Sequence, residues 1–191
     1  MTERIGAIVL AGGRSSRFGR DKLAEPFDGR PLLHHAITAV RALTDQVVVV
    51  AAPDADPPVP EGVALVHDLR PFEGPLAALA AGLAASRVDR VIVVAGDMPT
   101  LVPSVLGRLV AALEEGATAA ILAVDGPRAI LPVALATDPA SAAVSRLVST
   151  GERRLGALLD VLEVRIIPGV DWRQDDPDGR TLRDIDTPAD L

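Results

Sequence analysis

The sequence predicts a single-domain α/β protein, in which a mostly parallel, doubly wound sheet lies between two layers of helices. Short apolar runs rich in Val, Ile and Leu alternate with segments of helical apolar spacing, which is typical of βαβ units. Hydrophobic residues make up 49% of the chain and aromatic residues 2%, a balance that suits buried parallel strands covered by helices. The length of 191 residues fits one domain, residues 1–191, with a sizeable core.

The first half of the chain supplies three predicted strands and two helices. The apolar run Ile5–Leu10 is the first strand, and the turn-forming residues of 26–31 predict a turn or short hairpin. Leu33, Ile37 and Val40 follow helical spacing, so a helix is expected over 32–43. The remaining predicted elements are strands at 46–52 and 63–67 and an Ala- and Leu-rich helix that ends near residue 86.

The second half continues the alternation. Pro103 suits the first turn of a helix over 103–115, where its missing N–H costs nothing. Pro132 interrupts the apolar run 129–136, which predicts a strand at the edge of the sheet. The other predicted elements are strands at 90–95, 117–124 and 163–167, a helix from 138 to about 148, and a short helix that ends near 160.

Composition excludes several classes of protein. A net charge of -7 and a pI near 4.9 argue against a protein that coats nucleic acid or an anionic membrane. The absence of cysteine rules out disulfides, thiolate metal sites and thiol nucleophiles. No apolar run approaches the ~20 residues needed to span a bilayer, and Met1 to Arg4 leads straight into a strand. A cytoplasmic protein without nucleic-acid or membrane partners is therefore expected.

A glycine-containing loop follows the first strand. It holds four cations, Arg14, Arg17, Arg20 and Lys22. Exposed peptide N–H groups with convergent Arg and Lys side chains form an anion site, and a polyphosphate is the anion that uses them all. The alternative is a solvated, flexible turn. The Rossmann phosphate-loop pattern does not fit, because Gly12 and Gly13 are adjacent. The Walker pattern does not fit either, because five residues separate Gly13 from Gly19 and Arg20-Asp21 stands in place of Lys-Ser/Thr.

Two aspartates follow other predicted strands. Asp68 comes after the third strand and Asp97 after the strand at 90–95. Doubly wound sheets bind ligands beyond the carboxyl ends of their strands. The loop and both aspartates are therefore expected at one edge of the sheet.

Three motifs together resemble a known family. The segment 10–22, L-A-G-G-x-S-x-R-x-G-x-D-K, resembles the signature of nucleotidyltransferases that join an NTP to a phosphorylated metabolite, and most of all the molybdenum cofactor guanylyltransferase (MobA) family. Residues 96–99, G-D-M-P, resemble that family's C-D-x-P, with Gly96 in place of Cys. Residues 183–191 resemble its terminal N-x-N-T-P-E-D-L, with aspartates in place of asparagines.

The resemblance covers residues 5–191 and carries expectations about activity. It implies a nucleotide-diphospho-sugar-transferase-like Rossmannoid fold, with an N-terminal nucleotide-binding part and a C-terminal acceptor-binding part. It implies a Mg²⁺-dependent enzyme that transfers GMP from GTP to the phosphate of molybdopterin or molybdenum cofactor, releasing pyrophosphate. Other cofactor-biosynthesis proteins or a molybdoenzyme are further expected partners.

The resemblance also implies a nucleotide site. Arg17 would hold the β- and γ-phosphates, and Lys22 would offset charge near the α-phosphate; alternatively, Lys22 pairs with Asp21 or Glu25 on the surface. Gly13 favours GTP, because cytidylyl-transferring relatives usually carry L-A-A-G. The implied nucleotide-binding residues are Leu10, Ala11, Gly12, Gly13, Arg17, Lys22, Asp68 and Asp97, of which Lys22, Arg17 and Asp97 form the catalytic set.

Asp97 is the implied Mg²⁺ ligand, and Asp186 or Asp184 is the hypothetical second one. Mg²⁺ at such sites takes one or two carboxylates plus substrate oxygens and waters. In the alternative interpretation, Asp97 caps the helix that follows it. Asp186 would likewise only N-cap a helix begun by Thr187 and Pro188.

The acceptor side rests on two segments. Gly74, Pro75 and Leu76 match the family's G-P-L segment, and Arg153 and Arg154 match a G-E-R-R segment whose arginines would bind the acceptor's phosphate. The alternative for this arginine pair is plain surface charge. The histidines at 34, 35 and 67 are expected to be structural, and Trp172 has no assigned role.

Two other functions stay open. One is a sibling enzyme that uses CTP or another phosphorylated acceptor, such as phospholactate or a sugar phosphate. The other is a catalytically silent nucleotide-binding partner of a molybdoenzyme. The presence of Lys22, Arg17 and Asp97 argues against the silent protein, since binding alone does not require the metal carboxylate.

Overall fold

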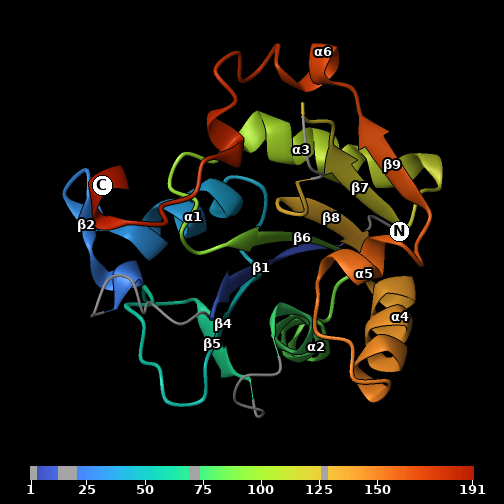
Figure 1. Cartoon of the computed structure of the whole chain (residues 1–191), viewed down its shortest axis with the longest axis horizontal. Helices are drawn as coiled ribbons and strands as arrows, with labels where there is room; N and C mark the ends of the chain where they lie inside the picture. The colour runs from blue at the N-terminus through green and yellow to red at the C-terminus, as the bar shows by residue number, and fades with distance from the viewer. Residues whose placement is uncertain (1–3, 13–20, 69–73, 126–128) are drawn as a thin grey trace.

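A twisted central sheet divides the molecule into two helical layers in the computed structural model, which describes residues 4–12, 21–68, 74–125 and 129–191 (Figure 1). Within these residues, seven strands pair in the order β5-β4-β1-β6-β8-β7-β9. This architecture confirms the predicted α/β fold. The strands are β1 (Ile5–Ala11), β4 (Val47–Ala51), β5 (Ala64–His67), β6 (Arg90–Ala95), β7 (Ala119–Leu122), β8 (Val133–Ala136) and β9 (Val164–Ile167).

The centre of the sheet is parallel and apolar. β1 pairs with β4 on one side and with β6 on the other, so that Val9 stands beside both Val49 and Val94. All three valines are fully buried. Because these strands run in the same direction, the segments that follow them leave the sheet at a single edge.

β8 runs antiparallel between β6 and β7, which corrects the prediction of an edge strand at 129–136. The strand begins only at Val133, so Pro132 lies outside the hydrogen-bonded ladder. Proline disrupts a strand only where its missing N–H was needed for pairing. The described edge strands are β5 and β9.

Helices cover both faces of the sheet. α1 (Leu32–Arg41) and α3 (Pro103–Ala112) pack with one apolar cluster, and α2 (Pro75–Ala85), α4 (Thr137–Ser149) and α5 (Gly156–Leu159) pack with the other. Figure 1 shows α1 and α3 on the opposite side of the sheet from α2, α4 and α5. β2 (Pro26–Phe27) and β3 (Arg30–Pro31) form the hairpin that was one of the two predicted alternatives.

Helix α2 lies unusually close to the sheet at Gly82. A β-carbon at this position would stand 2.7 Å from Cγ2 of Ile8 and 3.1 Å from Cγ2 of Val50. Both neighbours are buried, β-branched strand residues with little freedom to rotate away. Glycine is therefore required here by the distance between the helix and the sheet.

After β9, the chain folds back over α3 and ends near β2 (Figure 1). The short helix α6 (Gly169–Trp172), which was not predicted, begins this return. Trp172 is fully buried, and its indole Nε1 donates to the Ala123 carbonyl at 3.0 Å. Single turns of 3-10 helix follow at Arg180–Leu182 and Pro188–Asp190.

In the part of the chain that the structure describes, no helix is long and apolar enough to cross a bilayer.

Candidate active site

Three loops that carry predicted site residues leave the same edge of the sheet. Gly12 follows β1, Asp68 follows β5, and Gly96 and Asp97 follow β6. Two main-chain hydrogen bonds fix the beginnings of these loops: Gly96 N donates to Leu10 O at 2.9 Å, and Asp68 N donates to Ala51 O at 2.9 Å. The structure thus brings Leu10, Gly12, Asp68 and Asp97 to the expected edge.

Part of the first loop lies outside the described residues. Gly13 and Arg17 are among these positions, as are Arg14 and Arg20. The described chain resumes at Asp21, whose carboxylate accepts a hydrogen bond from the Leu23 amide at 3.0 Å. Asp21 therefore caps the 3-10 turn Lys22–Ala24.

Lys22 and Asp97 meet directly. The Lys22 Nζ donates to Asp97 Oδ2 at 2.7 Å and to the main-chain carbonyl of Ile185 at 2.7 Å. The two charged side chains are 15% and 23% exposed, so the pair is partly withdrawn from water while still reachable by a ligand. Two residues of the predicted catalytic set, 75 positions apart, therefore form one charged unit at the carboxyl edge of the sheet.

The C-terminal motif lies against this unit. The buried Ile185 donates its main-chain N–H to Asp97 O at 3.0 Å, which places Asp184 and Asp186 on either side of the contact. Partial desolvation of its carboxyl, together with repulsion from Asp186 and Asp97, raises the pKa of Asp184. The carboxylates of Asp97 and Asp186 thus act electrostatically on that of Asp184.

Asp186 is not the N-cap of the last turn. That position belongs to Thr187, which forms a reciprocal capping box with Asp190. Asp190 Oδ2 accepts from the Thr187 amide at 2.7 Å and from the Asp186 amide at 3.2 Å. The Asp186 side chain is therefore not used to start this helix.

The donor set at this edge is suited to a hard cation, since carboxylate oxygens are ligands that Mg²⁺ prefers. Within residues 4–12, 21–68, 74–125 and 129–191, no three His, Cys, Asp or Glu side chains are gathered to hold a metal by themselves. A Mg²⁺ ion at nucleotide sites commonly takes one or two carboxylates and completes its shell with phosphate oxygens and water. Asp97, with Asp184 or Asp186 nearby, fits that pattern.

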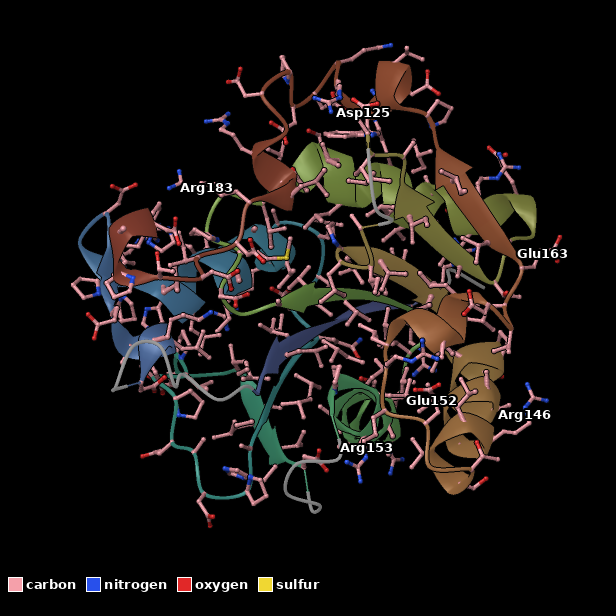
Figure 2. All side chains as sticks on the ribbon, in the orientation of Figure 1. Asp125, Arg146, Glu152, Arg153, Glu163 and Arg183 are labelled. Carbon is pink, nitrogen blue, oxygen red and sulfur yellow. The ribbon has the colours of Figure 1, made fainter. Side chains whose placement is uncertain are left out.

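The two segments predicted to bind the acceptor also come together. Leu76 N donates to the Arg153 carbonyl at 3.3 Å. Gly74 has a φ of +86°, and a β-carbon there would stand 2.9 Å from the Arg153 carbonyl oxygen. The start of α2, with Gly74, Pro75 and Leu76, is thus pressed against the main chain of Arg153 (Figure 2).

The adjacent arginines differ in their surroundings. Both oxygens of Glu152 accept from the Arg154 guanidinium, at 3.2 Å from Nε and 2.9 Å from Nη2. These bonds, with those from the amides of residues 154 and 153, lower the pKa of Glu152 to about 2. Among the described residues, no carboxylate pairs with the exposed Arg153 guanidinium.

The histidines have structural surroundings, as expected. The Nε2 atoms of His34, His35 and His67 lie 2.9, 2.7 and 3.0 Å from main-chain carbonyl oxygens. Each imidazole thus ties a loop or helix to neighbouring backbone.

Comparison with known proteins agrees with this geometry. The sequence profile of the MobA-like NTP transferase domain matches residues 7–166. The chain belongs to the MobA-like NTP transferase family. It is therefore a nucleotidyltransferase, as the resemblance of its sequence motifs implied.

Relatives of this MobA-like protein include proteins named "Probable molybdenum cofactor guanylyltransferase". One from Chloroflexus aggregans is 33% identical over 98% of this chain and 91% of its own length. Another from Mycobacterium avium is 34% identical over 98% of this chain and 93% of its own length.

Solved structures share the fold. Molybdopterin-guanine dinucleotide biosynthesis protein A from Archaeoglobus fulgidus is 25% identical, with a TM-score of 0.78 over 97% of this chain and 94% of that one. A 2-C-methyl-D-erythritol 4-phosphate cytidylyltransferase from Thermus thermophilus is 19% identical, with a TM-score of 0.72 over 98% and 95%. The second likeness concerns the fold alone.

Some residues at this edge were not predicted. Ile185 joins Lys22 to Asp97 through its main chain, and Thr100 and Thr181 connect the loop after β6 to the C-terminal segment. Main-chain groups and single threonines leave no mark in a sequence. Only the position of the terminal D-T-P motif hinted that this segment reaches the site.

Proposed function

We propose that this MobA-like protein transfers GMP from GTP to the phosphate of molybdopterin or molybdenum cofactor and releases pyrophosphate. The observation that carries the proposal is the Lys22–Asp97 pair at the carboxyl edge of the sheet, in a chain whose relatives are named for this activity. Other cofactor-biosynthesis proteins or a molybdoenzyme would receive the product.

The reaction needs positioning more than an activated nucleophile. An oxygen of the acceptor phosphate attacks the α-phosphorus of GTP, a new P–O bond forms, and the bond to the β-phosphate oxygen breaks as pyrophosphate leaves. A phosphate is already ionised at neutral pH, so the protein's task is alignment and charge neutralisation. Lys22 is assigned to the charge near the α-phosphate, and Arg17 to the β- and γ-phosphates.

Asp97 is assigned as the carboxylate ligand of Mg²⁺, with Asp186 or Asp184 as the second. The ion supplies positive charge to the phosphate oxygens. The ammonium group of Lys22 already neutralises Asp97, at 2.7 Å from its Oδ2. When a nucleotide binds with its ion, the ion and Lys22 would therefore both have to contact the Asp97 carboxylate. Lys22 and Asp97 would then take part together in nucleotide binding.

The nucleotide is assigned to the first loop and the ends of β1 and β5. Main-chain N–H groups of Ala11, Gly12 and Gly13 are suited to phosphate oxygens, and Leu10 and Asp68 to the nucleoside. The preference for GTP rests on Gly13.

The acceptor is assigned to the start of α2, Gly74 to Leu76, and to the arginine pair. Since Glu152 already holds Arg154, Arg153 is the better placed of the two to contact the acceptor's phosphate. Arg154 then acts by holding the turn in which Arg153 lies.

Isothermal titration with GTP, CTP and ATP, each with Mg²⁺, tests the proposal. We expect preferential GTP binding that Asp97→Ala and Lys22→Ala abolish, and pyrophosphate release on addition of molybdopterin. A preference for CTP would assign the protein to a cytidylyl-transferring sibling. GTP binding without pyrophosphate release would favour the silent nucleotide-binding partner.

A further inference from the structure

The chain from residue 173 to residue 186 is here called the C-terminal arm. It begins near β9, the last strand at one end of the sheet, and runs to the active-site edge. It starts beside α6, which follows the edge strand β9, and passes α3 (Figure 1). An ion pair between Arg108 of α3 and Asp175 holds its first part. Its last residues, Asp184 to Asp186, lie at the Lys22–Asp97 pair.

A buried carboxylate organises the middle of the arm. Asp176 is completely buried, yet the nucleotide chemistry proposed above gives it no role. Its Oδ1 accepts from the Arg180 amide at 3.0 Å, and its Oδ2 accepts from the Thr181 amide at 2.7 Å. Asp176 thereby closes residues 176–181 into a compact turn and orients Thr181.

The turn grips the loop that carries Asp97. The Thr181 hydroxyl oxygen accepts from the Val102 amide at 3.1 Å. The Thr100 hydroxyl donates to the Arg180 carbonyl at 2.8 Å. Thr181 is fully buried, so water cannot replace the bond to Val102.

Ile185 completes the connection at the other end of the loop. Its N–H donates to Asp97 O, and its carbonyl accepts from Lys22 Nζ. One peptide segment of the arm is thus bonded to both members of the charged pair. The loop over 97–102 is held by the arm at its first residue, in its middle and at its last residue.

We propose that Asp176 and Thr181 are positioning residues for the active site. They hold the loop over 97–102, and through this loop they fix the position of Asp97. The inference rests on the proposed function, in which Asp97 holds the metal ion. A carboxylate that binds metal depends on the groups that fix its backbone, and removing such outer contacts typically costs about 10- to 100-fold in metal affinity or activity.

The test compares Thr181→Val with Thr181→Ser. Valine removes the hydroxyl at nearly unchanged volume, whereas serine keeps it. We expect Thr181→Val to raise the Mg²⁺ concentration for half-maximal GTP-dependent pyrophosphate release about tenfold or more, and Thr181→Ser to behave like the wild type. Thr100→Val, which deletes a bond on the exposed side of the loop, should show a smaller effect in the same direction.

Thr118→Val is the matched control. The Thr118 hydroxyl likewise joins two segments, at the amino ends of β7 and β9. It accepts a hydrogen bond from Glu163 N at 2.9 Å and donates one to Glu163 O at 3.2 Å. Thr118→Val should leave the Mg²⁺ dependence unchanged. An equal Mg²⁺ shift in Thr118→Val, or a loss of thermal stability in Thr181→Val without any Mg²⁺ shift, overturns the proposal.

Amide hydrogen exchange gives a readout that needs no activity. In Thr181→Val, the Ile185 and Val102 amides should exchange about tenfold faster than in the wild type, and in Thr118→Val they should not, because local opening follows the loss of local contacts. Unchanged exchange refutes the arm's role even if the protein proves inactive. A wild-type protein that binds no GTP with Mg²⁺ refutes only the proposed function.

Discussion

Two neighbouring arginines show how local pairing assigns different tasks to the same residue type. Glu152 neutralises Arg154, and the hydrogen bonds from Arg154 and from the main-chain amides lower the pKa of Glu152 to about 2. Arg153 has its main chain fixed against Gly74, while its guanidinium extends from the surface beside α2 (Figure 2). An anchored backbone with an available charge suits recognition of an anionic acceptor.

Arg153→Ala is therefore expected to raise the KM for the acceptor by about 10- to 100-fold, because this factor corresponds to the free energy of one hydrogen bond to a charged group. The KM for GTP should stay within about twofold. Steady-state kinetics with each substrate varied in turn measures both constants. Arg154→Ala is the matched control, with an expected acceptor KM within about threefold of the wild type. Equal effects of the two variants would contradict the distinction drawn between them.

The sequence predicted individual site residues better than it predicted their contacts. Lys22 and Asp97 each stood in a recognisable motif, but the bond between them depends on β1 and β6 being neighbours. Asp186 was expected to be either a metal ligand or a helix cap, and the structure gives the cap to Thr187. Hydrogen bonds such as that from Val102 to Thr181 join residues 79 apart, a separation at which a motif carries no information.

Element packing depends on small residues where a helix approaches the sheet. Comparing two glycines inside helices distinguishes the effect of close packing from the effect of glycine on helix propensity. A β-carbon at Gly82 in α2 would clash with Ile8, whose Cγ2 it would approach to 2.7 Å, whereas a β-carbon at Gly107 in α3 would have no atom within 4 Å. Both positions carry the usual entropic cost of glycine in a helix.

Gly82→Ala is expected to lower the free energy of unfolding by about 1–3 kcal/mol, because the added methyl must displace buried side chains. Gly107→Ala should raise it by about 0.5–1 kcal/mol, since alanine restricts the unfolded chain without a clash. Denaturant unfolding of the two variants and the wild type measures these changes. Stabilisation by Gly82→Ala would mean that α2 moves away from the sheet easily.

Periodicity located most helices and strands within a few residues, and the exceptions have physical causes. The strand after Pro132 was wrongly expected at an edge, because a proline one residue before a strand is indistinguishable from one inside it. α6 has only four residues, too few to display a helical period. Its stability comes from burying Trp172, a tertiary contact.

At the scale of the whole molecule, the C-terminal arm links the outer strand β9 to the active-site edge, and Asp176 is its buried charge. Desolvation raises the pKa of Asp176. Hydrogen bonds from the amides of Thr181 and Arg180, together with the Thr181 hydroxyl and the charge of Arg180, outweigh this effect, so that the net pKa is lowered. A carboxyl with a lowered native pKa stabilises the fold above its unfolded pKa. That contribution is lost as the pH falls through the native value.

Asp176→Asn should therefore be less stable than the wild type at pH 7, and the difference should shrink below the ordinary aspartate pKa of about 3.9. Urea unfolding of both proteins at pH 7 and at successively lower pH values measures this convergence. Asp125→Asn is a suitable control, because Asp125 is exposed. A difference that stays constant or widens on acidification would show that the charge of Asp176 does not support the fold.

The burial of Trp172 also has a practical consequence. The chain contains one tryptophan and no tyrosine, so its near-ultraviolet fluorescence comes almost wholly from a single indole at the root of the arm. The indole donates a hydrogen bond to the Ala123 carbonyl, and the guanidinium carbon of Arg173 lies 4.8 Å from the centroid of its ring. If the arm separates from the rest of the molecule and exposes Trp172 to water, the emission maximum should shift to longer wavelength. The fluorescence of the unlabelled protein therefore reports whether the arm is bound.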